Sequence, residues 1–282
     1  MKRHTLRAAG VAALIGVFGF LEPAWAAGQP VPWGMGLQEG VTPVKHLVEN
    51  FHDLLLVIIT VITLFVLALL AYVAVRFNAK ANPTPTRTSH NTVLEVAWTV
   101  IPVIILIVVA VPSFRLLYVM ERTPEAEMTI KVTGRQWYWD YEYPDHGGFA
   151  FSSYMVQENE LKPGQPRLLA TDTHVVVPVD TVVRVQLTAG DVIHAWAMPA
   201  FGVKKDAVPG RLNETWFKVE KEGLFYGQCS EICGVNHGFM PITVEAVSKE
   251  KFAEWVAKAK VAYGTPDAKR ELAQVPAAAP AH

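Results

Sequence analysis

The sequence predicts a two-helix transmembrane hairpin followed by an all-β Greek-key barrel or sandwich with a C-terminal helix. Two long apolar segments lie within the first 120 residues, and short runs rich in Val, Thr, Tyr and Trp come after them. An amphipathic segment then precedes an Ala/Pro-rich tail. Elements of these types in this order are typical of a β domain that is anchored in a membrane. The formal net charge of −1 argues against nucleic-acid binding, which needs a basic surface.

The N-terminus has the three parts of a secretory signal peptide. A positive region that includes Arg3 and Arg7 precedes an apolar run over Ala8–Leu21, and Ala24-Trp25-Ala26 offers the small residues that cleavage requires. The alternative is a short membrane anchor, but the run is too short to cross about 30 Å of hydrocarbon. We therefore predict a signal peptide over residues 1–26.

Two further apolar segments are long enough to span a membrane. The first covers about Leu54–Val75 without a charged residue, and the second covers about Val93–Leu117. The second contains two prolines, which membrane helices tolerate because neighbouring groups satisfy the freed backbone. We predict a hairpin over residues 51–120, after a periplasmic segment over 27–50.

The loop between the spans gives the orientation. It carries Arg76, Lys80 and Arg87 and no acidic residue, so the positive-inside rule places it in the cytoplasm. Both termini and everything after the hairpin then face the periplasm, in agreement with the signal peptide. The predicted location is a bacterial inner membrane.

The second span begins with a helix-capping pattern. Thr92 and Glu95 have the spacing of a capping box, in which the Thr hydroxyl and the Glu carboxylate satisfy free backbone N–H groups. An acidic residue also suits a helix N-terminus. Carboxylates at membrane depth are functional hypotheses as well, so Glu95 has a structural and a functional interpretation.

The region over residues 121–263 has the pattern of short β-strands. In one run, Val183, Val185 and Leu187 share one face, as in a half-buried strand. The spacing predicts an antiparallel sandwich or Greek-key barrel. The predicted strands are Met128–Thr133, Trp137–Tyr143, His174–Val179, Val182–Thr188 and Met240–Ala246.

A helix is predicted to end this domain. Ser248 is a suitable N-cap, and the apolar residues that follow it share one helical face that can cover the barrel. Those residues are Phe252, Trp255, Val256 and Ala259. The tail over residues 264–282 is rich in Ala and Pro and is predicted to be disordered.

The strongest functional signal is a loop of soft metal ligands. Cys229, Cys233, His237 and Met240 lie within twelve residues, and the chain has no other cysteine. Thiolates, imidazole and thioether suit copper or zinc better than magnesium or calcium. A mononuclear electron-transfer copper site uses one Cys, so two cysteines leave one sulfur in surplus.

Two thiolates on a tight loop can bridge two copper ions instead. Each ion then needs an imidazole: His237 supplies one, and His194, at the end of an apolar strand signal, can supply the other. Zinc bound by two Cys and two His remains an alternative, as does a disulfide between the cysteines. Taken alone, His194 and Met240 are more often core residues than ligands.

Several stretches resemble subunit II of cytochrome c oxidase. They are Gly134–Trp139, Asp191–His194, Lys205–Arg211 and Tyr226–Pro241, together with the membrane hairpin. The resemblance runs from about residue 40 to about residue 258. It implies a cupredoxin-like barrel that holds a binuclear mixed-valence copper centre, called CuA. It also implies that Lys205–Arg211 lies at an interface with subunit I.

The resemblance implies a complete ligand set for this centre. The two copper ions would be bound by His194, Cys229, Cys233, His237, Met240 and the main-chain carbonyl of Glu231. The Glu231 carboxylate would bind a magnesium ion shared with subunit I. A hard cation suits that oxygen ligand, although the pattern alone indicates only a solvated loop carboxylate.

Roles outside the copper loop also come from the resemblance. Trp137 would accept electrons from cytochrome c, and Glu142, Asp172 and Asp191 would attract its lysine-rich face. Glu95 would lie at the mouth of a proton path into subunit I. On pattern alone, the aromatic run around Trp137 indicates core packing, and the acidic residues indicate solvated surface.

The predicted function is electron input to a respiratory cytochrome c oxidase. Partners would be cytochrome c, subunit I and subunit III, and the haems would belong to subunit I, where oxygen is reduced to water with proton pumping. A quinol oxidase subunit would lack the copper ligands that this chain keeps. The other alternative is a membrane-tethered periplasmic protein that binds and delivers copper.

Overall fold

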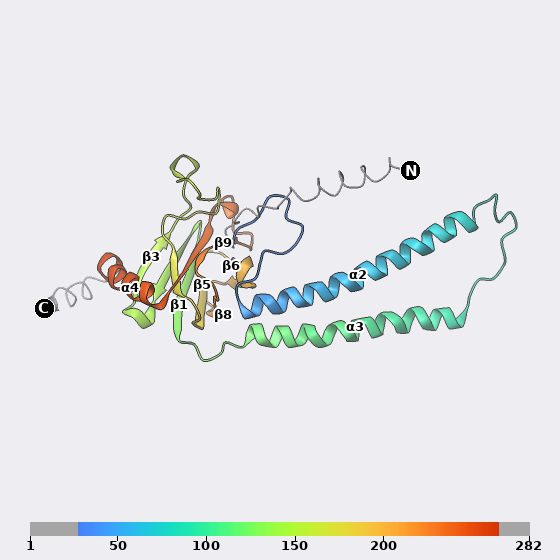
Figure 1. Cartoon of the computed structure of the whole chain (residues 1–282), viewed down its shortest axis with the longest axis horizontal. Coiled ribbons are helices and arrows are strands. Elements are labelled where there is room, and N and C mark those ends of the chain that lie inside the picture. The colour runs from blue at the N-terminus through green and yellow to red at the C-terminus, as the bar shows by residue number, and fades with distance from the viewer. Residues whose placement is uncertain (1–27, 265–282) are drawn as a thin grey trace, which may run out of the picture.

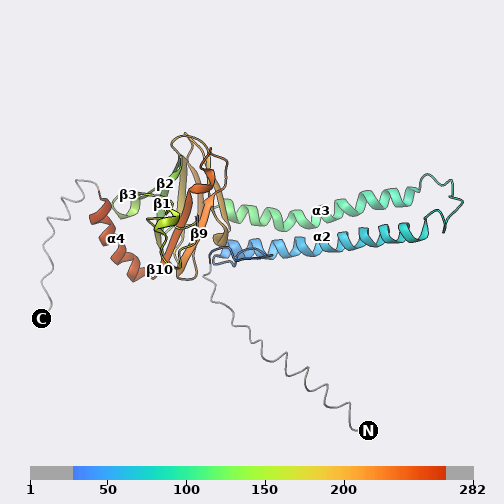
Figure 2. The same ribbon diagram turned by 90° about the horizontal axis from the view of Figure 1, so that it is seen from above.

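The fold is that of a computed structural model, which describes residues 28–264. Two long helices leave one side of a β domain as a hairpin, and a short helix covers the side away from that hairpin (Figures 1 and 2). The predicted signal peptide and residues 265–282 of the predicted tail lie outside the described residues.

The hairpin consists of α2 (Pro43–Arg76) and α3 (Thr92–Glu121). Both helices are long and apolar enough to cross a membrane. Helix α2 begins eleven residues before the predicted span, because the Thr42 side chain caps its first turn by accepting from the Lys45 N–H at 3.1 Å. A proline at the first helical position suits that start, since its missing N–H would have no partner there.

The capping box predicted at Thr92 is wrong. The N-cap is Asn91, whose side-chain oxygen accepts hydrogen bonds from the Val93 N–H at 3.1 Å and the Leu94 N–H at 3.2 Å. Thr92 is the first helical residue. Asparagine is at least as good an N-cap as threonine, so the cap lies one residue earlier.

The β domain is a sandwich of two five-stranded sheets, in the orders β3-β2-β1-β5-β8 and β4-β10-β9-β6-β7. The predicted fold class, a membrane hairpin and a cupredoxin-like β domain with a C-terminal helix, is confirmed. The strands are β1 Met128–Arg135, β2 Tyr138–Tyr143, β3 Phe149–Ser153, β4 Val175–Pro178, β5 Val183–Ala189, β6 His194–Met198, β7 Val203–Ala207, β8 Asn213–Phe217, β9 Gly223–Cys229 and β10 Pro241–Val247. Short 3-10 helices lie at Pro144–His146 (η1), Glu158–Glu160 (η2), Pro199–Phe201 (η3) and His237–Phe239 (η4).

The predicted antiparallel arrangement is only partly right, because the sheets also contain parallel pairs. Strand β1 pairs in parallel with β5, and β4 pairs in parallel with β10. Both pairs join strands that are far apart in the sequence, so strand spacing along the chain could not reveal them.

The core lies between the two sheets. Tyr141 of β2 and Trp196 of β6 are fully buried, and the indole N–H of Trp196 donates to the Tyr141 hydroxyl at 3.3 Å. Phe217 of β8 stacks on Trp196 with ring centroids 6.0 Å apart. These contacts cross from one sheet to the other and hold β6, which carries His194, against β2.

Helix α4 (Lys249–Tyr263) is the predicted C-terminal helix. The Ser248 hydroxyl caps it by accepting from the Lys251 N–H at 3.3 Å. Phe252, Val256 and Ala259 are buried on the predicted face, with Trp255 partly buried beside them.

Both membrane helices are tied to the β domain. Before α2, the Thr42 hydroxyl donates to the Phe201 carbonyl at 2.7 Å. At the end of α3, the Val119 carbonyl accepts from the indole of Trp216 at 3.1 Å, and Glu121 pairs with Lys205 at 2.9 Å. The hairpin is therefore fixed to the side of the domain that carries η3, β7 and β8.

Candidate metal centre

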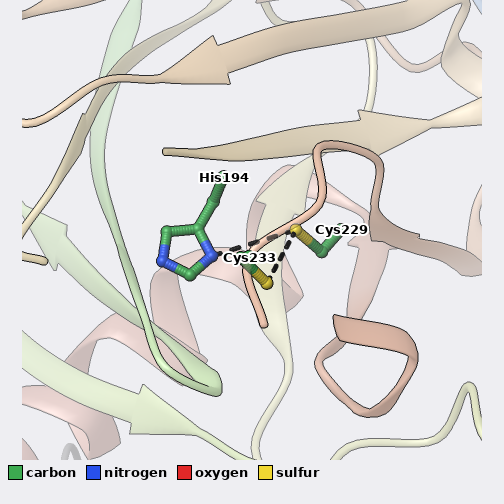
Figure 3. Close-up of side chains that lie close together, drawn as sticks. All are labelled: His194, Cys229 and Cys233. Atoms are coloured by element: carbon green, nitrogen blue, oxygen red, sulfur yellow. Dashed lines mark hydrogen bonds between the residues drawn. The ribbon is translucent and has the colours of Figure 1, made fainter. Parts of the chain in front are cut away.

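Two loops at one end of the second sheet bring the predicted ligands together. His194 opens strand β6, and Cys229 ends strand β9, which is paired with β6 in the register Trp196–Cys229. His194 is thus at the start of a strand, whereas the sequence pattern put it at the end of one. Cys233 lies in the loop after β9, and its sulfur points toward the same space (Figure 3).

The two cysteines are separate thiols. Their sulfur atoms lie 3.9 Å apart and are not bonded, and both side chains are buried. A disulfide needs its sulfurs about 2 Å apart, so the structure gives no support to that alternative.

Each cysteine sulfur faces a different imidazole. Nδ1 of His194 lies 3.9 Å from Sγ of Cys229, and Nδ1 of His237 lies 3.5 Å from Sγ of Cys233. Ligand atoms of His194, Cys229 and Cys233 all lie within 4.8 Å of one another. Two imidazoles that approach separate sulfurs suit two metal positions better than one tetrahedral zinc site.

Two weaker donors complete the cluster. Glu231 turns its main-chain carbonyl to Sγ of Cys229 at 3.4 Å, and Sδ of Met240 lies 3.6 Å from Sγ of Cys233. The donors thus divide into two sets: His194 and the Glu231 carbonyl beside Cys229, and His237 and Met240 beside Cys233. Two thiols, two imidazoles, a thioether and a carbonyl form a soft set that fits copper.

The cluster is largely shielded from solvent. The side chains of His194, Cys229, Cys233 and Met240 are buried, and His237 is partly exposed at the edge. Burial raises the pKa of Cys229, but hydrogen bonds to His194 and to the backbone near Ala195 and Glu231 outweigh it, and the net pKa is lowered to about 7. Burial and the nearby charge of Cys229 raise the pKa of Cys233. Of the two thiols, Cys229 therefore loses its proton at a lower pH than Cys233.

Asp191 holds His194 in place. Its carboxylate oxygen Oδ1 lies 2.8 Å from Nε2 of His194, which leaves Nδ1 facing the sulfurs. Burial raises the pKa of Asp191, yet hydrogen bonds from His194, Val192 and Gln136 outweigh it and lower that pKa overall. A carboxylate on the far nitrogen is the usual partner of a metal-binding histidine.

Trp137 lies beside the cysteine loop. An added Cβ on Gly234 would come within 3.0 Å of its indole ring, so the two are in close contact. The preceding residue, Gln136, donates from its side-chain amide to the Cys233 carbonyl at 2.7 Å. A surface hollow next to Trp137 is also lined by Tyr154, Asn236 and Phe239.

The predicted docking acids are in three different settings. Glu142 is partly exposed on β2 and pairs with Lys131 at 3.3 Å. Asp172 is exposed and accepts from the N–H of Tyr154, a residue of the hollow beside Trp137. Asp191 is exposed as a residue, but its carboxylate is hydrogen-bonded to His194. A docking role for these residues stays a prediction.

Glu95 is not part of this cluster. It is partly buried in the first turn of α3, at the end of the hairpin that lies away from the β domain (Figure 1). With 1.5 Å per residue, roughly 40 Å of helix separates it from the domain.

The sequence pattern missed two features of this site. It assigned no role to Gln136, and it gave Asp191 a docking role without its contact to His194. The three-residue spacing of Asp191 and His194 was a usable signal for that contact. Gln136 could not be identified in this way, because its partners Asp191 and Cys233 are 55 and 97 residues away.

Comparisons with known proteins identify the family of the chain. Residues 128–247 match the family model for the periplasmic domain of cytochrome c oxidase subunit II, and residues 30–116 match that for its transmembrane domain. Over 253 residues the chain is 54% identical to the probable cytochrome c oxidase subunit 2 of Rickettsia bellii, which covers 89% of this chain and 94% of that protein.

Two further proteins are similar in sequence to this chain. Cytochrome c oxidase subunit 2 of Cereibacter sphaeroides is 47% identical over 251 residues, covering 83% of this chain and 82% of that protein. The crystal structure of the periplasmic domain of subunit II of cytochrome oxidase from Bradyrhizobium japonicum is 58% identical. It covers 50% of this chain and 99% of that one, with a TM-score of 0.48.

Proposed function

We propose a role in electron input for this chain, which belongs to the cytochrome c oxidase subunit II family and is a membrane-anchored subunit of a haem-copper oxidase. In this role it accepts electrons from cytochrome c at a binuclear copper centre. It then passes them to a haem of subunit I. One observation carries this proposal: two unbonded thiols lie side by side, each with its own imidazole and its own weak donor. That donor set fits two copper ions.

Copper, when bound by this chain, would supply one-electron redox chemistry. The ligands proposed are His194, Cys229, Cys233, His237, Met240 and the Glu231 carbonyl. The chain holds these donors in nearly fixed positions, because His194 is at the start of a paired strand and the cysteine loop is anchored between β9 and β10. Rigid ligands keep structural change between redox states small, and the partners behind them orient the ligands.

Electron uptake is proposed to occur through Trp137. Its indole lies between the surface hollow and the cysteine loop, in contact with Gly234. Val235 and Phe239 expose apolar side chains near it, with exposed fractions of 86% and 47%. An exposed apolar patch with acidic residues nearby suits a short-lived complex with a basic electron carrier. Glu142, Asp172 and Asp191 are proposed to attract that carrier.

The remaining roles concern subunit I. The carboxylate of Glu231 is partly exposed and is proposed to bind a magnesium ion together with subunit I. Glu95 is proposed to receive protons at the cytoplasmic mouth of a path into subunit I. The reduction of oxygen to water and the coupled proton pumping would occur there, and subunit III would complete the complex. Both termini are proposed to lie in the periplasm.

Purification of the native complex through this chain tests the proposal. We expect a haem-containing membrane subunit to co-purify, about two copper atoms per chain beyond those of that subunit, and oxidation of reduced cytochrome c. A haem-free chain with one readily removed copper would contradict the proposal and would favour the copper-delivery alternative. The burial of both cysteines and His194 already argues against an exchangeable site.

The proton role of Glu95 needs a separate measurement. In the assembled oxidase, Glu95→Gln should slow steady-state turnover while leaving the copper spectrum unchanged, because the residue is far from the metal cluster. Turnover equal to that of the unmodified oxidase across the pH range would remove Glu95 from the proton path.

A further inference from the structure

Gln136 connects the two loops that carry the metal ligands. Its main-chain N–H donates to Oδ2 of Asp191 at 2.7 Å, and its side-chain amide donates to the main-chain carbonyl of Cys233, also at 2.7 Å. Both hydrogen bonds are short for N–H donors. One residue is therefore bonded at the same time to the His194 loop and to the cysteine loop.

Asp191 extends this connection to the imidazole. Its second oxygen, Oδ1, lies 2.8 Å from Nε2 of His194. The result is a continuous hydrogen-bonded path from His194 through Asp191 and Gln136 to Cys233. The bond to the cysteine loop comes from the Gln136 side chain and the bond to the Asp191 loop from its main chain, so a side-chain substitution removes only the bond to Cys233.

The residue that follows Gln136 is Trp137, which is held against the cysteine loop. Gly234 adopts a φ of +123°, a conformation that suits glycine, and a Cβ there would lie 3.0 Å from the Trp137 ring and 3.1 Å from the Gln136 amide nitrogen. The loop backbone thus packs directly on both residues, with no side chain between them.

We propose that Gln136 is a positioning residue that fixes the distance between the Trp137 ring and the cysteine loop. The inference rests on the proposed function, in which electrons pass from Trp137 to the metal cluster. Gln136 itself need not carry the electron or bind the metal. The Gln136 side-chain amide is bonded to the cysteine loop, and its main-chain N–H is bonded to the loop that carries His194. These two bonds hold the next residue, Trp137, against the cysteine loop.

The test compares two glutamines that line the same hollow. Gln136→Leu removes the amide that bonds to Cys233. Gln157→Leu is the matched control, because the Gln157 amide reaches only the Met155 carbonyl at 3.5 Å, on the surface. Both variants are made in the full chain within the assembled oxidase.

Four readouts separate positioning from other roles. For Gln136→Leu we expect the copper spectrum to be kept, and electron uptake at saturating cytochrome c to fall by roughly 10-fold or more, as for loss of other outer-shell partners. The cytochrome c concentration for half-maximal rate should stay the same. In the copper-free full chain, amides of the 233–238 loop should exchange hydrogen faster than in the control variant.

The outcomes are distinct. If Gln136→Leu and Gln157→Leu take up electrons equally fast, or if only the half-saturating cytochrome c concentration changes, Gln136 is not a positioning residue. Loss of copper from Gln136→Leu alone would make it a purely structural residue and would also overturn the proposal. If the unmodified oxidase shows no binuclear copper spectrum, the proposed function fails first.

Discussion

The two ends of strand β2 lie in regions that are stabilised by different interactions. Before its first residue, Trp137 and Gln136 contact the cysteine loop, and hydrogen bonds and soft ligand atoms dominate there. At its last residue, Tyr143 stacks on Phe149 at 4.9 Å and packs against Trp255 of α4 at 5.1 Å. The first region positions the proposed metal ligands, and the second stabilises the folded β domain that carries them.

This difference implies that substitutions in the two regions have opposite effects. A change near the cysteine loop should alter the metal centre or the electron uptake that leads to it, and should leave the folded domain nearly as stable. A change in the aromatic cluster should lower the free energy of unfolding and leave the spectrum of the surviving protein unchanged.

The largest effect is expected from Cys233→Ser. The substitution removes one of the two sulfurs proposed to bind copper, so the binuclear copper spectrum should be lost completely. The copper-free chain should unfold within a few degrees of the unmodified one, since the change is small in volume. Optical and paramagnetic spectra with thermal unfolding measure both effects, and a retained binuclear spectrum would contradict the ligand assignment.

The converse substitution is Phe149→Ala. Phe149 is fully buried between Tyr143 and Trp255, so its truncation should cost about 3–5 kcal/mol of unfolding free energy, as for other buried Phe residues. Chemical denaturation of the copper-free full chain measures this cost. The copper spectrum of the folded fraction should be unchanged; an altered spectrum would show that the two regions are not independent.

Trp137→Ala changes a residue that contacts the cysteine loop but is not a proposed metal ligand. We expect the copper spectrum to stay intact while electron uptake from cytochrome c slows at least about 10-fold, equivalent to ~1.4 kcal/mol of barrier. Rapid-mixing kinetics at saturating cytochrome c measure the rate. An unchanged rate would remove Trp137 from the electron path.

A smaller effect is expected from Asp172→Asn. The residue is exposed beside the hollow, so loss of its charge should weaken association with a basic cytochrome c by a few fold at low salt. The difference should disappear at high ionic strength, where exposed charges are screened. A difference that persists in high salt would mean that Asp172 acts through structure and not through charge.

The smallest expected effect concerns the pH dependence of stability. The hydrogen bond from His174 lowers the pKa of Glu245 below its ordinary value of 4.5. Such a group stabilises the folded state above about pH 4.5, and this stabilisation is lost as the pH falls through the folded-state pKa. Glu245→Gln should therefore make unfolding less sensitive to acid, by less than about 1 kcal/mol because the pair is partly exposed. An equal acid sensitivity would show that the pair contributes nothing.

Local patterns allowed much of this architecture to be predicted. The two spans and the amphipathic helix with its Ser248 cap depend on neighbours within a few residues, which the sequence displays directly. The capping box at Thr92 failed because Asn91 competed for the same role, and a spacing rule cannot rank two adjacent caps.

Non-local features were harder to predict. Cys229, Cys233, His237 and Met240 share one loop, so their proximity could be expected from spacing. The approach of His194 to Cys229 depends on the pairing of β6 with β9, and the parallel pairing of β1 with β5 is similarly invisible in strand spacing. The bonds of Gln136 required both loops to be in place, so only the folded chain revealed them.

The proposed function requires the two sulfurs and their separate imidazoles to bind a pair of copper ions that share one unpaired electron. Paramagnetic resonance of the copper-loaded full chain measures this sharing. We expect a many-line pattern from an electron delocalised over two copper nuclei. A four-line pattern from one copper per chain, or no copper signal at all after loading and oxidation, would contradict it.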